Sequence, residues 1–397
     1  MSVIRKWLCL LLVCLLVFPA VSGLADNPDG ETLEYLYSFI PGTVLEGEGT
    51  EMIRELLEEV KIRFSRQKTE TEDIIRIQLI SNGTDAFNLT AGETDGDEFA
   101  LMCSLLGSNK LTLKQEQITP FLRTLVESLG EQGFLKGDNL TKMYSIADRA
   151  GTAINNYLDQ EPEEAPVAGI DITPYLKTLT ENATAVEQRE IPPEERDASG
   201  AVVMTSYLLS EEQRREFVNM GIDKFSKVPV IGDALNDGSL RIGDQVITED
   251  FLRTVFGDTP GEVTMDVWQD EKGQLVRMLL HLPDLHGVVL DPEFAKTEGI
   301  ELTIARTYGE GKRLTSVTTL RLLGLEGNLV TMTLERAPTD PIPPMKAKKV
   351  HEVGEMNSTE LSELIRSMGW TILGNAGNMV LDLPDCIARV LVKKIFK

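Results

Sequence analysis

The stretch VTMDVWQDEKGQLVRMLLHL, residues 263–282, decides how this chain folds, because it has the pattern of a β-hairpin. Apolar and polar residues alternate along its first arm, in the order Val263, Thr264, Met265, Asp266, Val267 and Trp268. Since successive side chains of a strand point to opposite faces, we expect one apolar face and one wet face. The turn contains Asp270 and Gly273, residue types that turns favour. The pattern therefore predicts antiparallel strands over 263–268 and 274–282.

Similar patterns continue on both sides of this hairpin and predict a series of antiparallel strands. The other strands expected in this half cover residues 175–190, 201–209, 301–307, 314–322 and 329–335. Helical spacing of apolar residues interrupts the series at 211–227 and 248–256. Ser210 and Gln213 have the spacing of a capping box, in which each side chain bonds to a backbone amide at the start of a helix.

The first half of the chain also combines strands with helices. Short strand patterns, separated by turn residues, cover 73–80, 86–91, 98–106 and 111–116. Apolar residues at helical spacing predict helices over 50–66, 117–130 and 140–158. We interpret the residues up to about Thr43 as a loose N-terminal segment.

An acidic linker separates the two halves. Residues 159–167 contain Glu161, Glu163 and Glu164 together with two prolines, and such a segment builds no core because its carboxylates repel one another. The sequence thus predicts an α+β protein with two β-rich domains of antiparallel sheet packed on helices. The expected segments are a signal peptide at 1–25, an N-terminal α+β domain at 26–158, the linker at 159–167, a C-terminal β-rich domain at 168–340, and a tail at 341–397 that is helical near 358–368 and 385–396 and packs on the body.

The hairpin resembles one in the LolA/LppX-like half-barrel lipoproteins. The resemblance lies in a strand that ends in Val-Trp, a tight turn with Asp and Gly, and the sequence Leu-Val-Arg at 275–277. It covers mainly residues 175–336, where the order of strands, strand-to-helix junction and further strands is similar too. It implies curved, half-barrel-like sheets wrapped around helices, with a lipid or another apolar ligand held between sheet and helices. The chain lacks the lipobox cysteine that tethers many members of this family to a membrane.

Residues 1–25 have the pattern of a secretory signal peptide. Arg5 and Lys6 precede a nearly unbroken apolar run at 7–18, and small residues lead to Ala25. We expect cleavage after Ala25, with Gly23 as the alternative, and a secreted or extracytoplasmic location in the cell envelope. The run is shorter than the roughly 20 residues of a transmembrane helix, although a retained signal anchor stays open as an alternative.

The composition is strongly acidic, with 63 acidic residues against 39 basic ones and a formal net charge of −24. Such a charge repels nucleic acid, so nucleic-acid binding is excluded. The hydrophobic content of 42% is enough for folded cores. Residues 385–397 invert the local charge and form a basic amphipathic pattern, which lies either on an anionic membrane or on this acidic protein itself. We favour docking on the protein, and therefore expect no membrane contact there.

No complete catalytic or metal-binding motif occurs in the sequence. His281, Asp284 and His286 offer two imidazoles and a carboxylate, but no further ligand follows at the spacing of a metal site. The acidic turn at 94–98 does not fit a calcium loop, and we interpret it as a solvated hairpin tip. Serine-hydrolase, zinc-protease and phosphate-loop motifs are absent. We therefore expect no catalytic residues, no cofactor and no metal.

Cys103 and Cys386 are the two cysteines outside the predicted signal peptide. Export permits a disulfide between them, which would tie the C-terminus to the first domain. Two separate buried thiols are the favoured alternative, because Cys103 falls on the apolar side of a strand pattern. Five N-x-S/T sequons occur, at Asn82, Asn88, Asn139, Asn182 and Asn357, and their glycosylation depends on the source of the protein.

These observations predict an exported, non-catalytic binding or envelope-associated protein. Its expected partners are an apolar ligand or lipid, as the resemblance implies, or another envelope protein. Two alternatives stay open. One is a structural, assembly or regulatory protein of the cell envelope with no small-molecule ligand. The other is a secreted hydrolase that uses a pair of acidic residues, or His281, Asp284 and His286.

Overall fold

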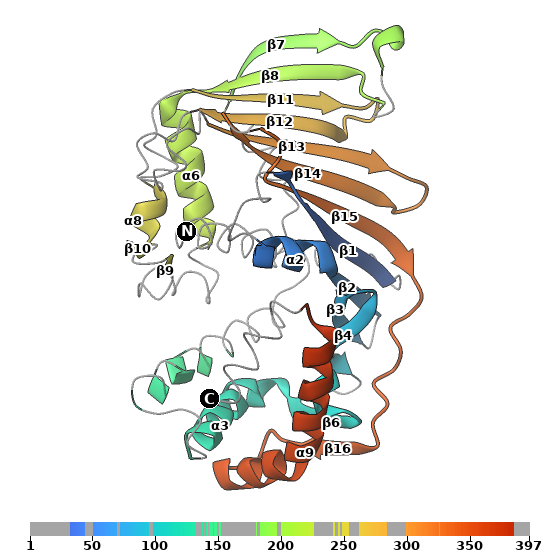
Figure 1. The fold of residues 1–397 in the computed structure, drawn as a ribbon, viewed down its shortest axis with the longest axis vertical. Helices are drawn as coiled ribbons and strands as arrows, with labels where there is room; N and C mark the ends of the chain where they lie inside the picture. Colours follow the sequence, from blue (N-terminus) through green and yellow to red (C-terminus); the bar gives the residue numbers. More distant parts are fainter. Residues whose placement is uncertain are drawn as a thin grey trace. The chain divides into compact units, whose positions relative to one another are not determined.

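The computed structural model is a mixed α+β structure in which strands predominate and run mostly antiparallel (Figure 1). It describes residues 32–43, 51–69, 72–94, 98–131, 137, 140–141, 143–145, 147–148, 151, 180, 183–196, 200–225, 241–242, 245–246, 248–253, 262–283, 299–324 and 326–384. The α+β class and the antiparallel sheet predicted from the sequence are confirmed. The predicted linker at 159–167 lies outside the described residues, so the domain boundaries stay predictions.

The chain forms two compact units. Unit 1 draws its described residues from Leu36–Glu58 and Gly169–Ala337. Unit 2 draws its described residues from Leu24–Tyr35, Glu59–Ala168 and Pro338–Lys397. The first strand, β1 (Thr32–Pro41), is divided between them.

Unit 1 contains strands in the order β15-β14-β13-β12-β11-β8-β7. Their bounds are β7 (Thr184–Glu190), β8 (Val203–Leu209), β11 (Val263–Gln269), β12 (Leu275–Pro283), β13 (Gly299–Tyr308), β14 (Leu314–Leu323) and β15 (Val330–Thr339). The pairings within this series are antiparallel. The short elements are η4 (Pro193–Glu195), α8 (Glu249–Leu252) and the strand pair β9 (Arg241–Ile242) and β10 (Gln245–Val246), while α2 (Glu51–Glu59) and α6 (Glu211–Phe225) are longer helices.

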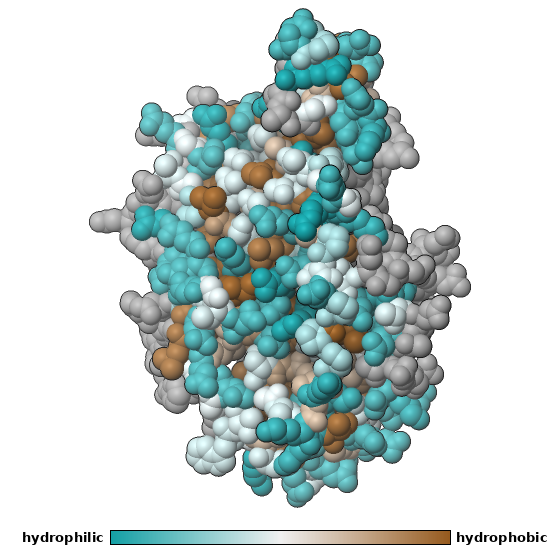
Figure 2. Space-filling model, turned by 90° about the vertical axis from the view of Figure 1, so that its right-hand side faces the viewer, coloured by the Kyte–Doolittle hydropathy of each residue, from teal (hydrophilic) through white to brown (hydrophobic). Residues whose placement is uncertain are grey.

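The hairpin at 263–282 forms as predicted, with one apolar and one polar face. Met265 lies opposite Leu280, and Val267 lies opposite Met278, so their side chains share a face. Met265 is 0% exposed and belongs to the main apolar cluster of this unit. On the view in Figure 2, hydrophilic side chains predominate over the strands, with hydrophobic ones scattered between them. The predicted capping box is also confirmed, because the Ser210 backbone N–H donates to Gln213 Oε1 at 2.9 Å and the Gln213 N–H donates to Ser210 Oγ at 3.3 Å.

Unit 2 contains strands in the order β16-β6-β5-β4-β3-β2. Their bounds are β2 (Val60–Lys68), β3 (Asp73–Ser81), β4 (Thr84–Thr94), β5 (Glu98–Cys103), β6 (Asn109–Lys114) and β16 (Lys349–Glu352). The pairings are antiparallel except that β16 runs parallel to β6. Two short helical turns, η2 (Ser104–Leu106) and η3 (Gln115–Gln117), follow β5 and β6.

Helices α3 (Ile118–Glu131) and α9 (Ser358–Asp382) cover one face of the unit 2 sheet (Figure 1). On that face Phe99 lies opposite Leu113, and both belong to an apolar cluster with Ile118 of α3 and Leu364 of α9. The two helices also meet through a buried hydrogen bond, 2.7 Å long, between the hydroxyls of Ser128 and Ser362.

Two expectations for the N-terminal part were wrong. The helix predicted over 50–66 ends at Glu59, and β2 begins at Val60. Apolar residues at 60, 62 and 64 alternate with period two, and helical spacing alone did not separate this strand from the helix before it. The segment interpreted as loose contains β1, whose residues Leu33, Tyr35, Tyr37 and Phe39 alternate in the same way and are buried.

The tail differs from the sequence prediction in two ways. It contributes a strand, β16, where only helices were expected, and α9 extends to Asp382 instead of ending near 368. Strand β16 is short and carries charged residues, so its sequence shows little of the apolar alternation that indicates a strand. Its pairing with β6 makes it a strand. The second helix expected in the tail, at 385–396, lies outside the described residues.

Candidate functional site

Residues 341–347, which we call the strap, cross one face of the unit 2 sheet before β16 begins (Figure 1). At one end, the backbone N–H of Ile342 donates to Gln67 Oε1 of β2 at 2.6 Å, and the Ile342 side chain is buried. At the other end, the N–H of Lys348 donates to the Ser108 carbonyl at 2.9 Å, next to the pairing of β16 with β6. The strap is therefore fixed to the sheet at both ends.

The composition of the strap keeps it from becoming another strand. Pro341, Pro343 and Pro344 have no backbone N–H, so the segment cannot form a regular ladder of hydrogen bonds. The Lys346 N–H instead donates to the Pro344 carbonyl at 2.7 Å within the strap itself. A pocket of about 270 Å³ lies between the strap and strands β3 to β5, and we call it the strap pocket.

The polar part of the strap pocket comes from the sheet and from the strap. Arg76 of β3 lies opposite Thr90 of β4, which lies opposite Met102 of β5, so these three side chains form one row on the same face. Asn88 of β4 and Lys346 of the strap complete the polar lining. In the part of the chain that the structure describes, the side chains of Arg76, Asn88, Thr90 and Lys346 have no hydrogen-bond or ion-pair partner.

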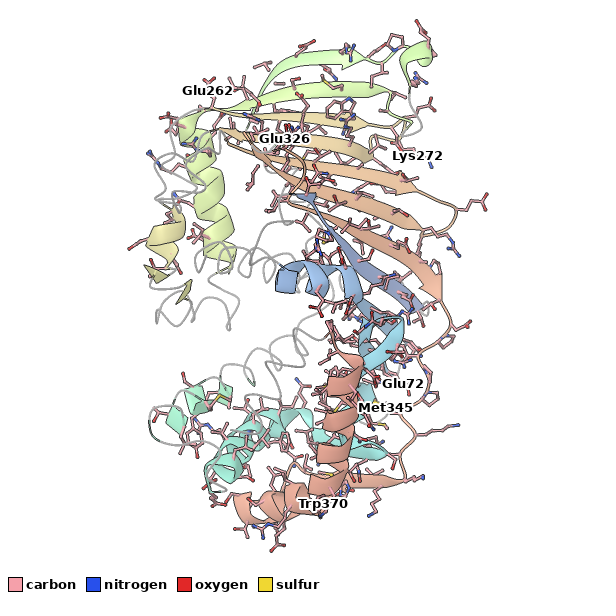
Figure 3. All side chains as sticks on the ribbon, in the orientation of Figure 1. Glu72, Glu262, Lys272, Glu326, Met345 and Trp370 are labelled. Atoms are coloured by element: carbon pink, nitrogen blue, oxygen red, sulfur yellow. The ribbon has the colours of Figure 1, made fainter. Side chains whose placement is uncertain are left out.

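The apolar part of the strap pocket comes from Met102 and from the strap residues Ile342, Pro343, Pro344 and Met345. Figure 3 labels Met345. Cys103, Ser104 and Gly107 complete the described lining, which contains no His, Asp or Glu. The arrangement offers hydrogen-bond donors beside apolar surface, which suits a ligand with both kinds of group.

The strap pocket lies on the face of the sheet opposite to α3 and α9. Met102 lines the pocket, whereas Phe99 and Leu113 pack with the helices, and residues an odd number apart in a strand point to opposite faces. On the helix face, the described side chains pack against one another in a core cluster. A ligand between sheet and helices therefore stays a prediction, and the pocket gives a different location to test.

Cys103 lies half-buried at the end of β5 and lines the strap pocket. Cys386 lies outside the described residues, so the disulfide between them stays a prediction.

His281 lies on β12 opposite Glu301 of β13, while Asp284 and His286 lie outside the described residues. The tip of the acidic turn, 95–97, lies outside them as well. Within the described ranges, no group of three or more His, Cys, Asp or Glu side chains is placed to hold a metal ion. The described helices include none that is long and apolar enough to cross a membrane.

Three of the five sequons fall on described residues. Asn82 lies in an exposed turn with a positive φ of 50°, and Asn88 lines the strap pocket. The Asn357 side chain accepts a hydrogen bond from the Glu360 N–H at 3.0 Å and caps α9. The other two, Asn139 and Asn182, lie outside the described residues.

Helix α9 carries two large apolar side chains that are exposed in the described part of its unit. Trp370 is 88% exposed and Leu381 is 83% exposed, and Figure 3 shows Trp370 on this helix. Residues 370, 374, 377 and 381 recur at helical spacing, so they lie along one stripe. A methyl group added at Gly374 or Gly377 would meet no atom within 4 Å, so neither glycine is required by packing among the described residues.

Sequence reasoning missed the strap pocket. It treated Pro341, Pro343 and Pro344 as the start of a tail, and it treated Arg76 as one residue of a strand pattern. A signal was present, because Arg76 is the only cation in the run DIIRIQLI, residues 73–80, in which five of the eight residues are Ile or Leu. That signal does not show which segment crosses the face on which the arginine lies.

No family model, no curated protein and no solved structure matches this chain.

Proposed function

We propose that the chain is an exported, non-catalytic binding protein, and that the strap pocket of unit 2 holds a small amphipathic ligand. One observation carries the proposal: polar side chains without described partners and apolar side chains converge on one pocket beneath a segment fixed at both ends. Concave sites that combine apolar surface with a few placed polar groups are typical of small-molecule binding.

At about 270 Å³, the pocket is slightly smaller than the usual range for ligand sites, which is about 300–1,000 Å³. It therefore suits a small molecule, or one end of a longer molecule whose remainder lies in solvent. The resemblance to half-barrel lipoproteins supports the same class of function, because it implies an apolar ligand. Export follows from the pattern of residues 1–25.

Filling the pocket tests this proposal. Thr90→Phe places a ring in the row between Arg76 and Met102, in a strand position where aromatic residues are well tolerated. We expect the wild-type protein to bind a fluorescent apolar probe, and the variant to lose at least tenfold in affinity. Thr333→Phe, a half-buried site on β15 in unit 1, is the matched control and should bind like wild type.

Native mass spectrometry before and after extraction with organic solvent gives a second measurement. A co-purifying small molecule that disappears on extraction, and that Thr90→Phe lacks, supports the proposal. A wild-type protein that carries no such molecule and binds no probe contradicts it. Equal probe binding by Thr90→Phe and wild type contradicts the location.

A second candidate function is an interaction protein of the cell envelope, and the exposed side chains of Trp370 and Leu381 favour it. Large exposed apolar residues along one helix stripe are typical of surfaces that a partner covers. A photo-crosslinking residue at position 370 should then give an adduct of one fixed mass in the envelope, and Leu381→Ser should remove it. The same residue at Glu271, whose side chain is 77% exposed, is the control. Identical adducts from both positions would contradict this candidate.

A further inference from the structure

Arg76 occupies an unusual position for a cation in this chain. It lies half-buried on β3, with Ser65 of β2 and Thr90 of β4 as its cross-strand neighbours. Both neighbours are neutral. A partly desolvated charge is costly unless an opposite charge or hydrogen bonds compensate it, so a lone arginine at this position calls for an anionic partner.

The acids near Arg76 in the sheet are engaged elsewhere. Asp73 accepts two hydrogen bonds from Arg66, at 2.9 and 2.6 Å, and Asp85 accepts one from Gln78 at 2.6 Å. Although the chain has 63 acidic residues, no described one pairs with Arg76. The guanidinium is left available to a ligand in the strap pocket.

The other polar groups that line the strap pocket also favour an anionic ligand. Lys346 adds a second positive charge from the strap, and no described lining residue carries a negative charge. The Asn88 amide and the Thr90 hydroxyl add further hydrogen-bond donors. Donors therefore predominate over acceptors around the pocket, and the ligand group that complements them is an anion with several acceptor oxygens.

The apolar lining limits which anion fits. Met102, Ile342 and Met345 lie beside the polar groups, so a bare inorganic anion would leave much of the pocket without complementary contacts. A carboxylate matches the planar fork of one arginine through two parallel hydrogen bonds. Its attached hydrocarbon would lie against the methionines and the isoleucine.

We propose that the strap pocket binds a small carboxylic acid with an apolar chain, with Arg76 as the bidentate anchor and Lys346 as a supporting charge. This inference rests on the proposed function and adds the chemical class of the ligand. It predicts that the carboxylate, rather than the hydrocarbon alone, determines affinity.

Calorimetric titration of the full chain tests the inference with three probes: octanoate, 1-octanol and inorganic phosphate. We expect octanoate to bind at least tenfold more tightly than 1-octanol or phosphate. Arg76→Gln should weaken octanoate binding by about 10- to 100-fold, because a charge-assisted bidentate pair is lost. Lys346→Gln should weaken it by a smaller factor, about two- to fivefold, because this lysine is exposed.

Matched variants separate the role of the anchor from a general change in charge or folding. Arg321→Gln, at an exposed position on β14 in unit 1, changes the net charge equally and should leave octanoate binding unchanged. Arg76→Lys keeps the charge but loses the planar fork, so its affinity should fall between those of wild type and Arg76→Gln. This second variant keeps the test valid if Arg76→Gln folds poorly.

The outcomes distinguish this inference from the function on which it rests. If 1-octanol binds as tightly as octanoate, and Thr90→Phe abolishes the binding of both, the proposed role of the carboxylate is refuted while the proposed binding function stands. If phosphate binds as tightly as octanoate, the proposed contribution of the apolar chain to affinity is refuted. If no probe binds, and no small molecule co-purifies, both proposals fail.

Discussion

Replacing Gln67 by Leu tests whether the strap is held as the structure indicates. Gln67 Oε1 accepts the buried backbone N–H of Ile342 at 2.6 Å, and Leu has a similar size but no acceptor. A buried N–H left without a partner costs about 1–3 kcal/mol. The buried Ile342 side chain still contributes about 1.5–3 kcal/mol, so the strap should stay in place but open more often.

The expected increase in opening follows from this cost. Since 1.4 kcal/mol corresponds to a tenfold change, the population of the open strap should rise by about 5- to 150-fold. Native-state hydrogen exchange of the amides at 342–348 measures it, because local opening controls exchange there. Gln188→Leu on the exposed strand β7 is the control and should leave these amides unchanged. Unchanged exchange at 342–348 in a folded Gln67→Leu protein would refute the reasoning.

Four further predictions concern other parts of the chain. Met265→Ala, at a fully buried site in unit 1, should lower the free energy of unfolding by about 2–5 kcal/mol in urea titrations, and a loss below 1 kcal/mol would contradict the core described here. Ser128→Ala should cost about 1–3 kcal/mol because it removes the buried partner of Ser362, and the double variant with Ser362→Ala should cost less than the sum of the two single changes. A hydrogen bond from Arg123 lowers the pKa of Asp148, so this pair stabilises the fold at pH values above the ordinary carboxyl pKa, and the stabilisation is lost as the pH falls through the lowered pKa. Carbon NMR titration of Asp148 should show the lowered midpoint, and Arg123→Gln should return that midpoint to the ordinary range. Thiol titration of the denatured, unreduced protein tests the disulfide, and two free thiols would exclude pairing of Cys103 with Cys386.

The sequence predicted best those strands in which alternation is strong and turn residues mark the ends. The hairpin of β11 and β12 is the clearest case, because Val263, Met265 and Val267 alternate with polar residues before a turn with Asp and Gly. The sequence prediction missed the boundary between α2 and β2 for a physical reason. Val60 and Phe64 are four residues apart, a spacing that fits one face of a helix and one face of a strand equally well.

The sequence alone could not predict strand β16 or the strap, because the structure of both segments depends on residues far away in the chain. Val350 and His351 lie in a segment that becomes a strand only by pairing in parallel with Lys110 and Leu111, about 240 residues earlier. The Ile342 anchor likewise depends on Gln67, 275 residues away in sequence. Composition showed that the prolines interrupt the strand series, but not that the segment after the interruption returns across the sheet.

The two faces of the unit 2 sheet differ in chemistry, and this difference explains why the site lies under the strap. The helix face is apolar and is filled by side chains that interdigitate. The strap face contains Ser65, Gln78 and Thr112, which are all buried although they are polar. Alternating polar residues normally indicate a face that water covers, so the sequence gives no sign of burial there. A helix would need an apolar surface to dock on this face, whereas a proline-bearing strap needs only anchors at its two ends. The segment between the anchors then leaves the strap pocket open beside Arg76, so a polar sheet face and a segment poor in backbone donors together produce a pocket.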